Sequence, residues 1–329
     1  MTLVDKLKTT NFSLRLGNGI NRYASDEHDL NHSWRGVLRA IAMERGALPG
    51  DAADEILDDP SGVSFPEFID LISLDHGGNQ ADDQPTIKQE LSEMIAGWVP
   101  SVTHSRVVNY CHSHDIPILT TNYDTLLAQS AEHVIDFVTN QNRQTRKKHL
   151  QSPINQRGRG FTRYYPWHSF YSDKDVSDSD VLDSFAIWHV HGVHHYPDSI
   201  RLGLMDYMSF ITRAKAWIQT GIGARWRDPA SHEDWDGANS WLDLFLHKPL
   251  VIAGLALDVQ ETTLRWLLIE RARFYRRNAT YGEAGAWYYI AFLQDGEVSA
   301  AKQHFIQSLG GTIITYESYG DFYGGAFGG

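Results

Sequence analysis

The amino-acid sequence predicts an α/β protein with a doubly wound, mainly parallel Rossmann-like sheet and helical insertions. Short apolar runs, mostly bounded by Gly, Pro, Asn or Asp, alternate with stretches of helical periodicity, which is the pattern of βαβ units. One such run leads into Gly17-Asn18-Gly19, a turn typical of nucleotide-binding folds. Hydrophobic residues make up 42% of the 329 residues, enough for a packed core.

Each element is assigned from its local pattern. Seven apolar runs are expected to be strands: residues 12–16, 116–120, 134–138, 185–190, 250–253, 288–293 and 312–316. Two helices are expected from apolar residues on one face of a 3.6-residue period: Tyr207, Phe210, Ile211, Ala214 and Ile218 in the first, and Leu264, Leu267, Leu268, Ala272 and Tyr275 in the second. Asp258 and Glu261 have the spacing of a capping box at the start of the second helix.

We expect a single domain over residues 1–329. Within it, residues 51–100 are expected to form a helical insertion, residues 139–183 an insertion loop and residues 320–329 a flexible Gly-rich tail. The stretch 137–172 has no Asp or Glu and seven basic residues: Arg143, Arg146, Lys147, Lys148, Arg157, Arg159 and Arg163. It is either a solvated loop, neutralised by the acidic residues that follow, or a lid or docking surface.

Composition limits the classes of function. The formal net charge of −12 argues against general nucleic-acid binding, because a polyanion would be repelled. Cys111 is the one cysteine, so neither a disulfide framework nor a thiolate zinc cluster can form within the chain. No run is long and apolar enough for a membrane span and no apolar leader is seen, so the expected location is the cytoplasm.

The first motif of chemical interest is the glycine turn at residues 17–21. Gly17 and Gly19 would let backbone amides approach a pyrophosphate without interference from Cβ atoms. The third glycine of the usual dinucleotide pattern is missing, since the chain continues Asn21-Arg22-Tyr23. An ordinary tight turn therefore remains the alternative interpretation.

A second motif, Thr120-Thr121-Asn122-Tyr123-Asp124, follows the predicted strand 116–120. Ligands of open α/β sheets bind at the carboxyl ends of strands, which is where Thr121, Asn122 and Asp124 are expected. The alternative is that Asn122 or Asp124 caps the next helix, although a cap needs only one of them.

Two further strand ends complete the set. His191 and Gly192 end the run 185–190, where an imidazole could work as a base; a core histidine bonded to the backbone is the alternative. A site made of histidines alone, with His194 and His195, is not expected to bind metal because no carboxylate is suitably spaced. The run 250–253 ends at Gly254 and continues to an acidic residue, Asp258.

Together these four strand ends resemble the sirtuin superfamily, in its bacterial branch of NAD-hydrolysing anti-phage defence effectors. Gly17-Asn18-Gly19-Ile20 is similar to that family's G-A-G-I-S loop, and Thr120-Thr121-Asn122-Tyr123-Asp124 to its T-T-N-Y-D form. His191-Gly192 resembles its H-G, and residues 254–258 resemble its late G-x-S-x-x-D turn. The resemblance covers roughly residues 14–268.

The resemblance implies NAD⁺ as substrate and a site without metal. Asn122 would position the ribose and the attacking water, and His191 would act as the base near the ribose hydroxyls. Asp124 would hold the nicotinamide amide. The remaining residues implied to bind NAD are Gly17, Asn18, Gly19, Ile20, Asn21, Thr121, Gly192, Gly254 and Asp258.

The sequence also departs from the family. Ala256 and Asn21 stand where the family has Ser, and no match to its P-D-F-R stretch follows the glycine turn. From Gly192 to the last residue there is no cysteine, so the four-cysteine zinc module of the deacetylating members is absent. Deacylation is therefore not expected.

The leading hypothesis is an NAD⁺ glycohydrolase that releases nicotinamide and ADP-ribose, acting as an anti-phage effector. The alternatives are a module that senses NAD or ADP-ribose without turnover and, less favoured, an ADP-ribosyltransferase or deacylase. Because free activity would endanger the host, we expect a homo-oligomer or a complex with a companion defence protein, by analogy a HerA-type ATPase or an Argonaute-type sensor.

Overall fold

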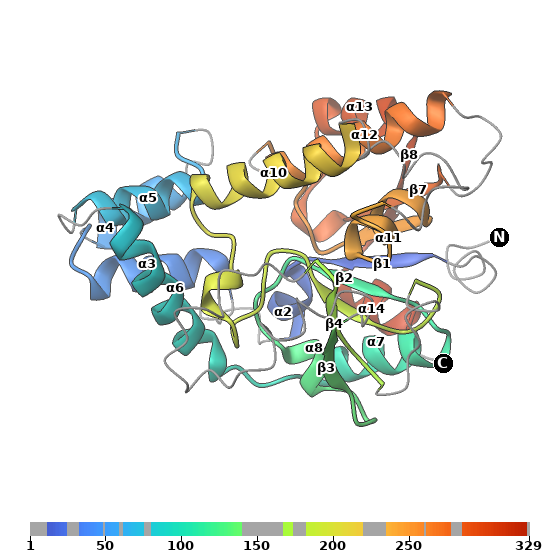
Figure 1. The fold of residues 1–329 in the computed structure, drawn as a ribbon, viewed down its shortest axis with the longest axis horizontal. Helices are drawn as coiled ribbons and strands as arrows, with labels where there is room; N and C mark the ends of the chain where they lie inside the picture. Colours follow the sequence, from blue (N-terminus) through green and yellow to red (C-terminus); the bar gives the residue numbers. More distant parts are fainter. Residues whose placement is uncertain are drawn as a thin grey trace.

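The computed structural model describes residues 12–24, 33–48, 50–58, 62–75, 80–139, 167–173, 182–219, 235–259, 261–277 and 285–327. Within these ranges lies an eight-stranded sheet (Figure 1). Its strands are β1 (Ser13–Leu16), β2 (Ile118–Thr120), β3 (Asp136–Thr139), β4 (Ser169–Ser172), β5 (Ile187–His189), β6 (Leu250–Ala253), β7 (Trp287–Phe292) and β8 (Gly311–Tyr316). All seven predicted strands are present, and β4 was not predicted.

The strand order is β3-β4-β5-β2-β1-β6-β7-β8. Neighbours from β5 to β8 pair in parallel, whereas β4 pairs antiparallel with both β3 and β5. When the six parallel strands are numbered in chain order, their spatial order is 3-2-1-4-5-6, which is that of the dinucleotide-binding Rossmann fold. The α/β architecture therefore fits a Rossmann-like fold.

Helices connect most of the strands. They are α2 (Gly19–Ala24), α3 (Trp34–Glu44), α4 (Gly50–Asp58), α5 (Phe65–Asp75), α6 (Gln80–Ala96), α7 (Val102–Ser113), α8 (Leu126–Gln129), α10 (Leu204–Gln219), α11 (Trp241–His247), α12 (Thr262–Arg277), α13 (Ala300–Ser308) and α14 (Tyr319–Gly325). The two helices predicted from periodicity are α10 and α12. The predicted capping box is wrong: α12 begins at Thr262, and Asp258 instead pairs with Lys302.

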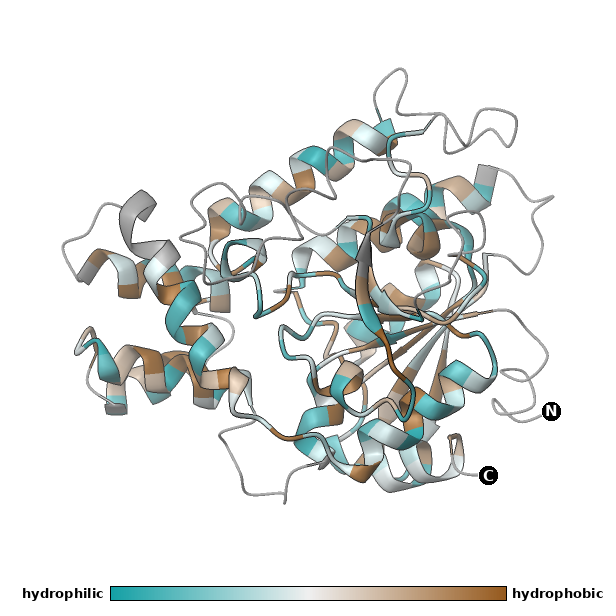
Figure 2. Cartoon of the chain, turned by 60° about the horizontal axis from the view of Figure 1, so that its bottom comes forward, coloured by the Kyte–Doolittle hydropathy of each residue, from teal (hydrophilic) through white to brown (hydrophobic). Residues whose placement is uncertain are grey.

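Side chains alternate between the two faces of the sheet, so two apolar clusters form. Leu250 and Ile252 of β6 belong to a cluster that includes residues of α10, α11 and α12. Val251 and Ala253 belong to another, with residues of α2, α7 and α14. The fully buried β6 side chains on both faces explain why this strand reads as a continuous apolar run. Figure 2 shows the apolar strands between the two sets of helices.

Helices α3, α4, α5 and α6 form a separate group at one end of the molecule (Figure 1). They bury their own apolar cluster, which also takes in Tyr123, Ile200 and Leu202 from the strand-end loops. The segment predicted as a helical insertion, 51–100, thus packs together with α3. Through these loop residues the helical group contacts the carboxyl ends of the strands.

The C-terminal segment differs from the flexible tail that was expected for residues 320–329. Helix α14 begins after a capping box made by Ser318 and Asp321. Phe322 and Tyr323 are fully buried and Phe327 is nearly so. The aromatic residues between the glycines anchor the segment against the sheet, because each buries a large apolar area. Residues 328–329 lie outside the described residues.

Two other expectations remain outside the structure. The basic residues Arg143 to Arg163 fall in 140–166, which the structure does not describe, so most of the predicted insertion loop 139–183 is not placed.

None of the helices in the described ranges combines the length and apolar character that crossing a membrane requires.

Candidate functional site

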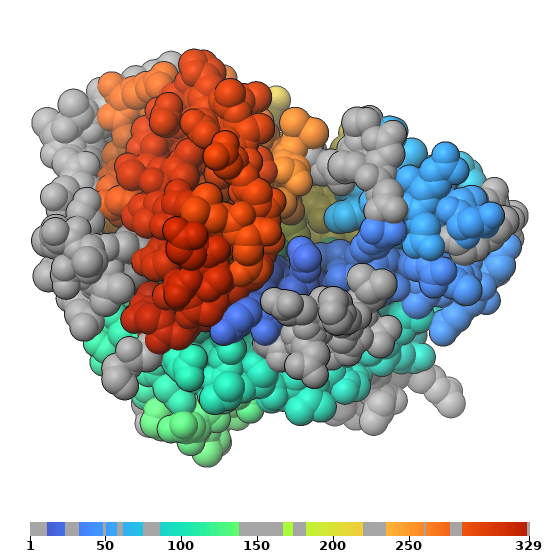
Figure 3. All heavy atoms as spheres, turned by 180° about the vertical axis from the view of Figure 1, so that it is seen from behind, coloured from blue at the N-terminus to red at the C-terminus, as the bar shows by residue number. Residues whose placement is uncertain are grey.

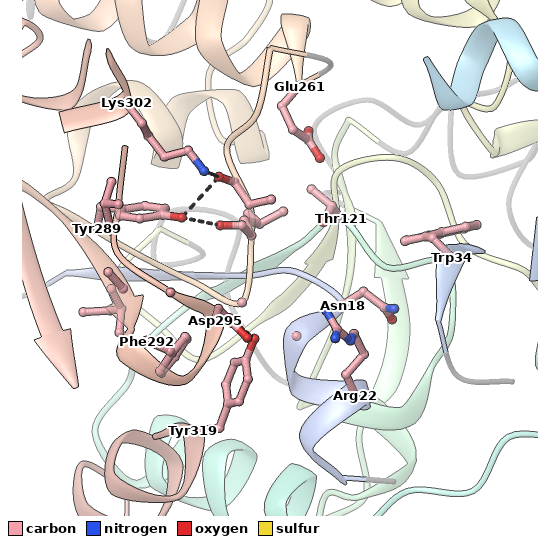
Figure 4. A pocket seen from close by; sticks show the side chains of 18 of the residues that line it. Asn18, Arg22, Trp34, Thr121, Glu261, Tyr289, Phe292, Asp295, Lys302 and Tyr319 are labelled. Carbon is pink, nitrogen blue, oxygen red and sulfur yellow. Dashed lines mark hydrogen bonds between the residues drawn. The ribbon is translucent and has the colours of Figure 1, made fainter. Parts of the chain in front are cut away.

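A cavity of about 770 Å³ opens beyond the carboxyl ends of β1, β6 and β7. In Figure 3 the surface is hollowed between the orange–red C-terminal part and the blue helices. The wall on the N-terminal side carries Asn18, Gly19 and Arg22 with Trp34 of α3, and the opposite wall runs from Gly254 to Lys302 (Figure 4). The cavity has the size of a small-molecule or cofactor site.

The glycine turns after β1 and β6 pack directly on each other. The Gly19 amide donates to the Gly254 carbonyl at 3.0 Å, and the Gly17 amide donates to the Ala253 carbonyl at 3.1 Å. A Cβ on Gly17 would lie 2.4 Å from the Gly254 oxygen, and one on Gly19 would lie 2.6 Å from the Gly254 Cα. Gly254 itself has φ +66, a conformation that favours glycine. Glycine is therefore required at these positions because the backbones of the two turns pack in direct contact.

The residues after the glycine turn have mainly structural contacts. Asn18 lines the cavity, but Ile20 is fully buried in the core. Asn21 is a hub: its Nδ2 donates to Asn18 Oδ1 at 2.9 Å and to Asp124 Oδ2 at 2.8 Å, and its Oδ1 lies 3.0 Å from His104 Nε2. Asp124 Oδ1 accepts from the Leu126 amide, at the start of α8. Asp124 thus ties the β1 and β2 loops together, and neither Asn21 nor Asp124 lines the cavity.

Thr121 and Asn122 follow β2 directly. Thr121 lines the cavity, whereas Asn122 lies behind it and is 2% exposed. The side-chain nitrogen Nδ2 of Asn122 donates to the Gly17 carbonyl at 3.5 Å. The side-chain oxygen Oδ1 of Asn122 is buried with no hydrogen-bond partner in the described part of the chain. A buried polar atom without a partner costs about 1–3 kcal/mol, which a ligand that donates to it would recover.

His189 and His191 do not share one role. His189 Nδ1 lies 2.9 Å from the Asn122 carbonyl, so the loops after β2 and β5 are fastened side by side. His191, 6% exposed, packs edge-on against Tyr207 with ring centroids 5.4 Å apart. Burial, with Arg15 and Arg201 nearby, lowers the pKa of His191 to about 3. Its imidazole is therefore neutral at pH 7 and able to accept a hydrogen bond.

Gly192 and Asp258 do not reach the cavity. Gly192 has φ +96, and a Cβ on it would lie 2.3 Å from the Ser199 carbonyl oxygen, so the glycine serves a close backbone approach. Asp258 is exposed and pairs with Lys302 at 2.9 Å. Of the predicted site residues, the cavity is lined by Asn18, Gly19, Thr121 and Gly254.

A charged group that the sequence did not single out for binding lies beside this set. Glu261 lines the cavity opposite Thr121 (Figure 4). Burial raises the pKa of its carboxyl, and Arg15, buried on β1, opposes that rise. Burial is the main cause that raises the pKa values of Tyr123 and Tyr207, and the Glu261 carboxylate raises them further. Glu261, Arg15, Tyr207 and His191 therefore form one electrostatic neighbourhood.

The rest of the lining combines aromatic rings with charges of both signs. Its basic side chains are Arg22, Arg35 and Lys302; its acidic ones, besides Glu261, are Asp295 and Glu297; and its aromatic ones are Trp34, Phe65, Tyr289, Phe292 and Tyr319. Lys302 donates to the Ala256 carbonyl at 2.8 Å, and the Tyr289 hydroxyl donates to it at 3.2 Å (Figure 4). Such a mixture suits a ligand with anionic groups and flat rings.

Several of these residues were missed for identifiable reasons. Glu261 was taken for a capping residue because of its distance from Asp258. Trp34 and Phe65 come from the helical group, whose docking against the strand ends no local pattern announces. Asp295 and Gly296 lie shortly after the end of β7 at Phe292, and this strand-end position could have pointed to them.

Among the described residues, no cluster of three or more His, Cys, Asp or Glu side chains could hold a metal ion. No known protein-family model matches this chain, and no curated protein sequence matches it either.

Proposed function

We propose that this chain is a cytoplasmic NAD⁺ glycohydrolase, which cleaves the bond between nicotinamide and ribose and releases ADP-ribose. The proposal is carried by one observation: Thr121 and the two glycine turns line the cavity, and the residue after Thr121, Asn122, has a buried side-chain oxygen with no partner in the described chain. The sequence resemblance to NAD-hydrolysing sirtuin-like proteins supports it.

The position of the cavity supports a dinucleotide ligand. In a doubly wound sheet of order 3-2-1-4-5-6, ligands bind where the strand order reverses, between the first and fourth parallel strands. Those strands are β1 and β6 here, and the cavity is lined by the turns that follow both. Arg22, Arg35 and Lys302 are the basic lining residues that we propose meet the pyrophosphate.

The chemistry asks little of the protein beyond positioning. Water attacks C1′ of the ribose, the N-glycosidic bond breaks with its electron pair neutralising the cationic nicotinamide ring, and the attacking water gives up one proton to the solvent. Because the leaving group needs no proton, no strong acid is required. We propose that Asn122 orients the ribose and the water, and that the neutral imidazole of His191 accepts a hydrogen bond from a ribose hydroxyl or the water.

The proposal is tested by following nicotinamide release from NAD⁺ by chromatography. We expect wild type, assayed alone and with the product of its neighbouring gene, to release nicotinamide under at least one of these conditions. We expect Asn122→Ala to be slower there by at least about 100-fold, the order of effect of losing one positioned group. The matched control is Asn109→Ala, on α7 and outside the cavity lining. Equal rates for wild type and Asn122→Ala would contradict the proposal.

A second function is favoured by a different observation. Neither Asn122 nor His191 lines the cavity, and both are almost fully buried. A module that binds NAD or ADP-ribose without turnover would have such a site. Calorimetry followed by chromatography separates the two functions, because a sensing module would bind NAD⁺ and return it intact after long incubation.

We further propose that the activity is that of an anti-phage effector and is gated by assembly, either as a homo-oligomer or with a companion defence protein such as a HerA-type ATPase or an Argonaute-type sensor. An ungated NAD⁺ hydrolase would deplete its own host. Nicotinamide release measured with and without the product of a neighbouring gene tests this gating. A rate that is high for the isolated monomer and unchanged by the companion would contradict it.

A further inference from the structure

Glu261 differs from the other carboxylates around the cavity. Asp295 accepts a hydrogen bond from the Tyr319 hydroxyl at 2.5 Å, and Glu297 is exposed, whereas Glu261 is only partly exposed. The Glu261 side chain makes no hydrogen bond or ion pair with any residue of the described ranges, although its backbone amide donates to the Asp258 carbonyl at 3.0 Å. Among the described residues, the carboxyl group of Glu261 therefore has no hydrogen-bond partner.

The Glu261 side chain is open to the cavity. Glu261 is partly exposed, and its exposed part faces the cavity that it lines (Figure 4). On its protein side lie the Arg15 guanidinium and the Tyr207 and Tyr123 hydroxyls, close enough to interact electrostatically. A half-buried carboxylate without a hydrogen-bond donor is costly, so a cation or a donor in the cavity would stabilise it.

The charges of the cavity are arranged unevenly. Glu261 points toward Thr121 (Figure 4), whereas the basic residues belong to other elements: Arg22 to α2, Arg35 to α3 and Lys302, which is paired with Asp258, to α13. A ligand that carries a positive ring at one end and phosphates at the other would match this arrangement. The oxidised nicotinamide ring is such a cation, and the reduced ring is neutral.

We propose that Glu261 is the specificity-determining group that selects the cationic, oxidised nicotinamide ring over the neutral, reduced one. This inference rests on the proposed function only in taking a nicotinamide dinucleotide as the ligand. It requires a carboxylate that faces the ring and does not require that the ring be cleaved. Glu261 is thus a binding group, separate in role from Asn122 and His191.

The test is a set of calorimetric titrations with NAD⁺, NADH and ADP-ribose. They are performed in the Asn122→Ala background, so that NAD⁺ stays intact, with and without Glu261→Gln. Gln keeps the size of the side chain and removes its charge. We expect the added substitution to weaken NAD⁺ binding about tenfold, which corresponds to one charge contact, and to change NADH and ADP-ribose binding less than about twofold.

The matched control is Glu317→Gln, an exposed position outside the cavity lining. Unchanged ADP-ribose binding shows that the Glu261→Gln protein is folded and its cavity intact. Equal losses for all three ligands, or no loss for NAD⁺, would overturn the inference. If wild type releases nicotinamide but Glu261→Gln leaves NAD⁺ affinity unchanged, the inference fails and the proposed function stands. If NAD⁺ is preferred through Glu261 but never cleaved, the inference stands and the hydrolase fails.

Discussion

His191 is kept neutral by its surroundings. Burial is the main cause, and the positive charges of Arg15 and Arg201 add to it. His189, one residue away from the turn, has a pKa lowered to about 4, mainly by burial. The imidazoles of His189 and His191, at the end of β5, therefore stay uncharged at pH values near 6.5, at which the histidines of an unfolded chain take up protons. We therefore expect the fold to lose stability in acid.

This acid sensitivity gives a prediction for His191→Gln. Because the folded pKa of His191 lies below its unfolded value, its contribution to stability is present above pH 6.5 and is lost as the pH falls towards 3. For one such histidine, lowering the pH from 7 to 5 costs about 2 kcal/mol. The unfolding free energy is measured by urea denaturation at pH 7 and at pH 5. We expect its decrease between these two pH values to be smaller in His191→Gln than in wild type, by about 2 kcal/mol.

The control for this experiment is His304→Gln on α13, where the side chain is exposed. It should show the same loss of stability between pH 7 and pH 5 as wild type. An acid sensitivity of His191→Gln equal to that of wild type would show that the imidazole is not held neutral in the fold.

The strand-end turns are elements whose mutual packing builds the floor of the cavity. Gly17→Ala tests this packing, because its Cβ would lie 2.4 Å from the Gly254 carbonyl oxygen and 2.5 Å from Leu255 side-chain atoms. A backbone atom cannot move aside as a flexible side chain can. We expect a loss of about 1–3 kcal/mol in unfolding free energy, the usual range for forced overpacking, together with weaker ADP-ribose binding.

Gly97→Ala is the matched control for Gly17→Ala, because nothing lies within 4 Å of a Cβ at Gly97. It should leave ADP-ribose affinity unchanged and change stability little. If the two variants were equally stable, the contact between the β1 and β6 turns would not constrain the site.

At the level of elements, the sequence predicts the sheet well where strands are buried on both faces. The run at β6 is apolar throughout and lies between two helical layers, so its composition alone marks it. Strand β4 has the mixed sequence Ser-Phe-Tyr-Ser and pairs with β5 through a single register pair, Tyr171 with Ile187, so no periodic pattern reveals it. The tail was misjudged because its glycines suggested flexibility while its aromatic residues determined the packing.

The candidate site was predicted less completely than the sheet. Strand-end position identified Asn18, Gly19, Thr121 and Gly254 on the cavity wall. Strand-end position could not separate residues that line the cavity from residues that hold the loops together, such as Asn21, because both kinds are polar and close in sequence. Residues supplied by distant elements, such as Trp34, depend on tertiary packing and leave no local signal.

For the whole molecule, the helical group α3–α6 and the C-terminal layers enclose the ends of the central strands. Trp34 stands where these parts meet: it lines the cavity and packs edge-on against Tyr123, with ring centroids 4.6 Å apart. Phe65 of α5 lines the same side. The cavity therefore belongs to the assembled chain and not to any one of its layers, and its occupant is the central question.

The most direct test of the account is the crystal structure of Asn122→Ala protein soaked with NAD⁺. We predict that the pyrophosphate lies against Asn18, Gly19 and Gly254, and that the nicotinamide ring lies between Thr121 and Glu261. NAD⁺ bound elsewhere on the chain, or bound here with its nicotinamide end at Lys302, would contradict the account.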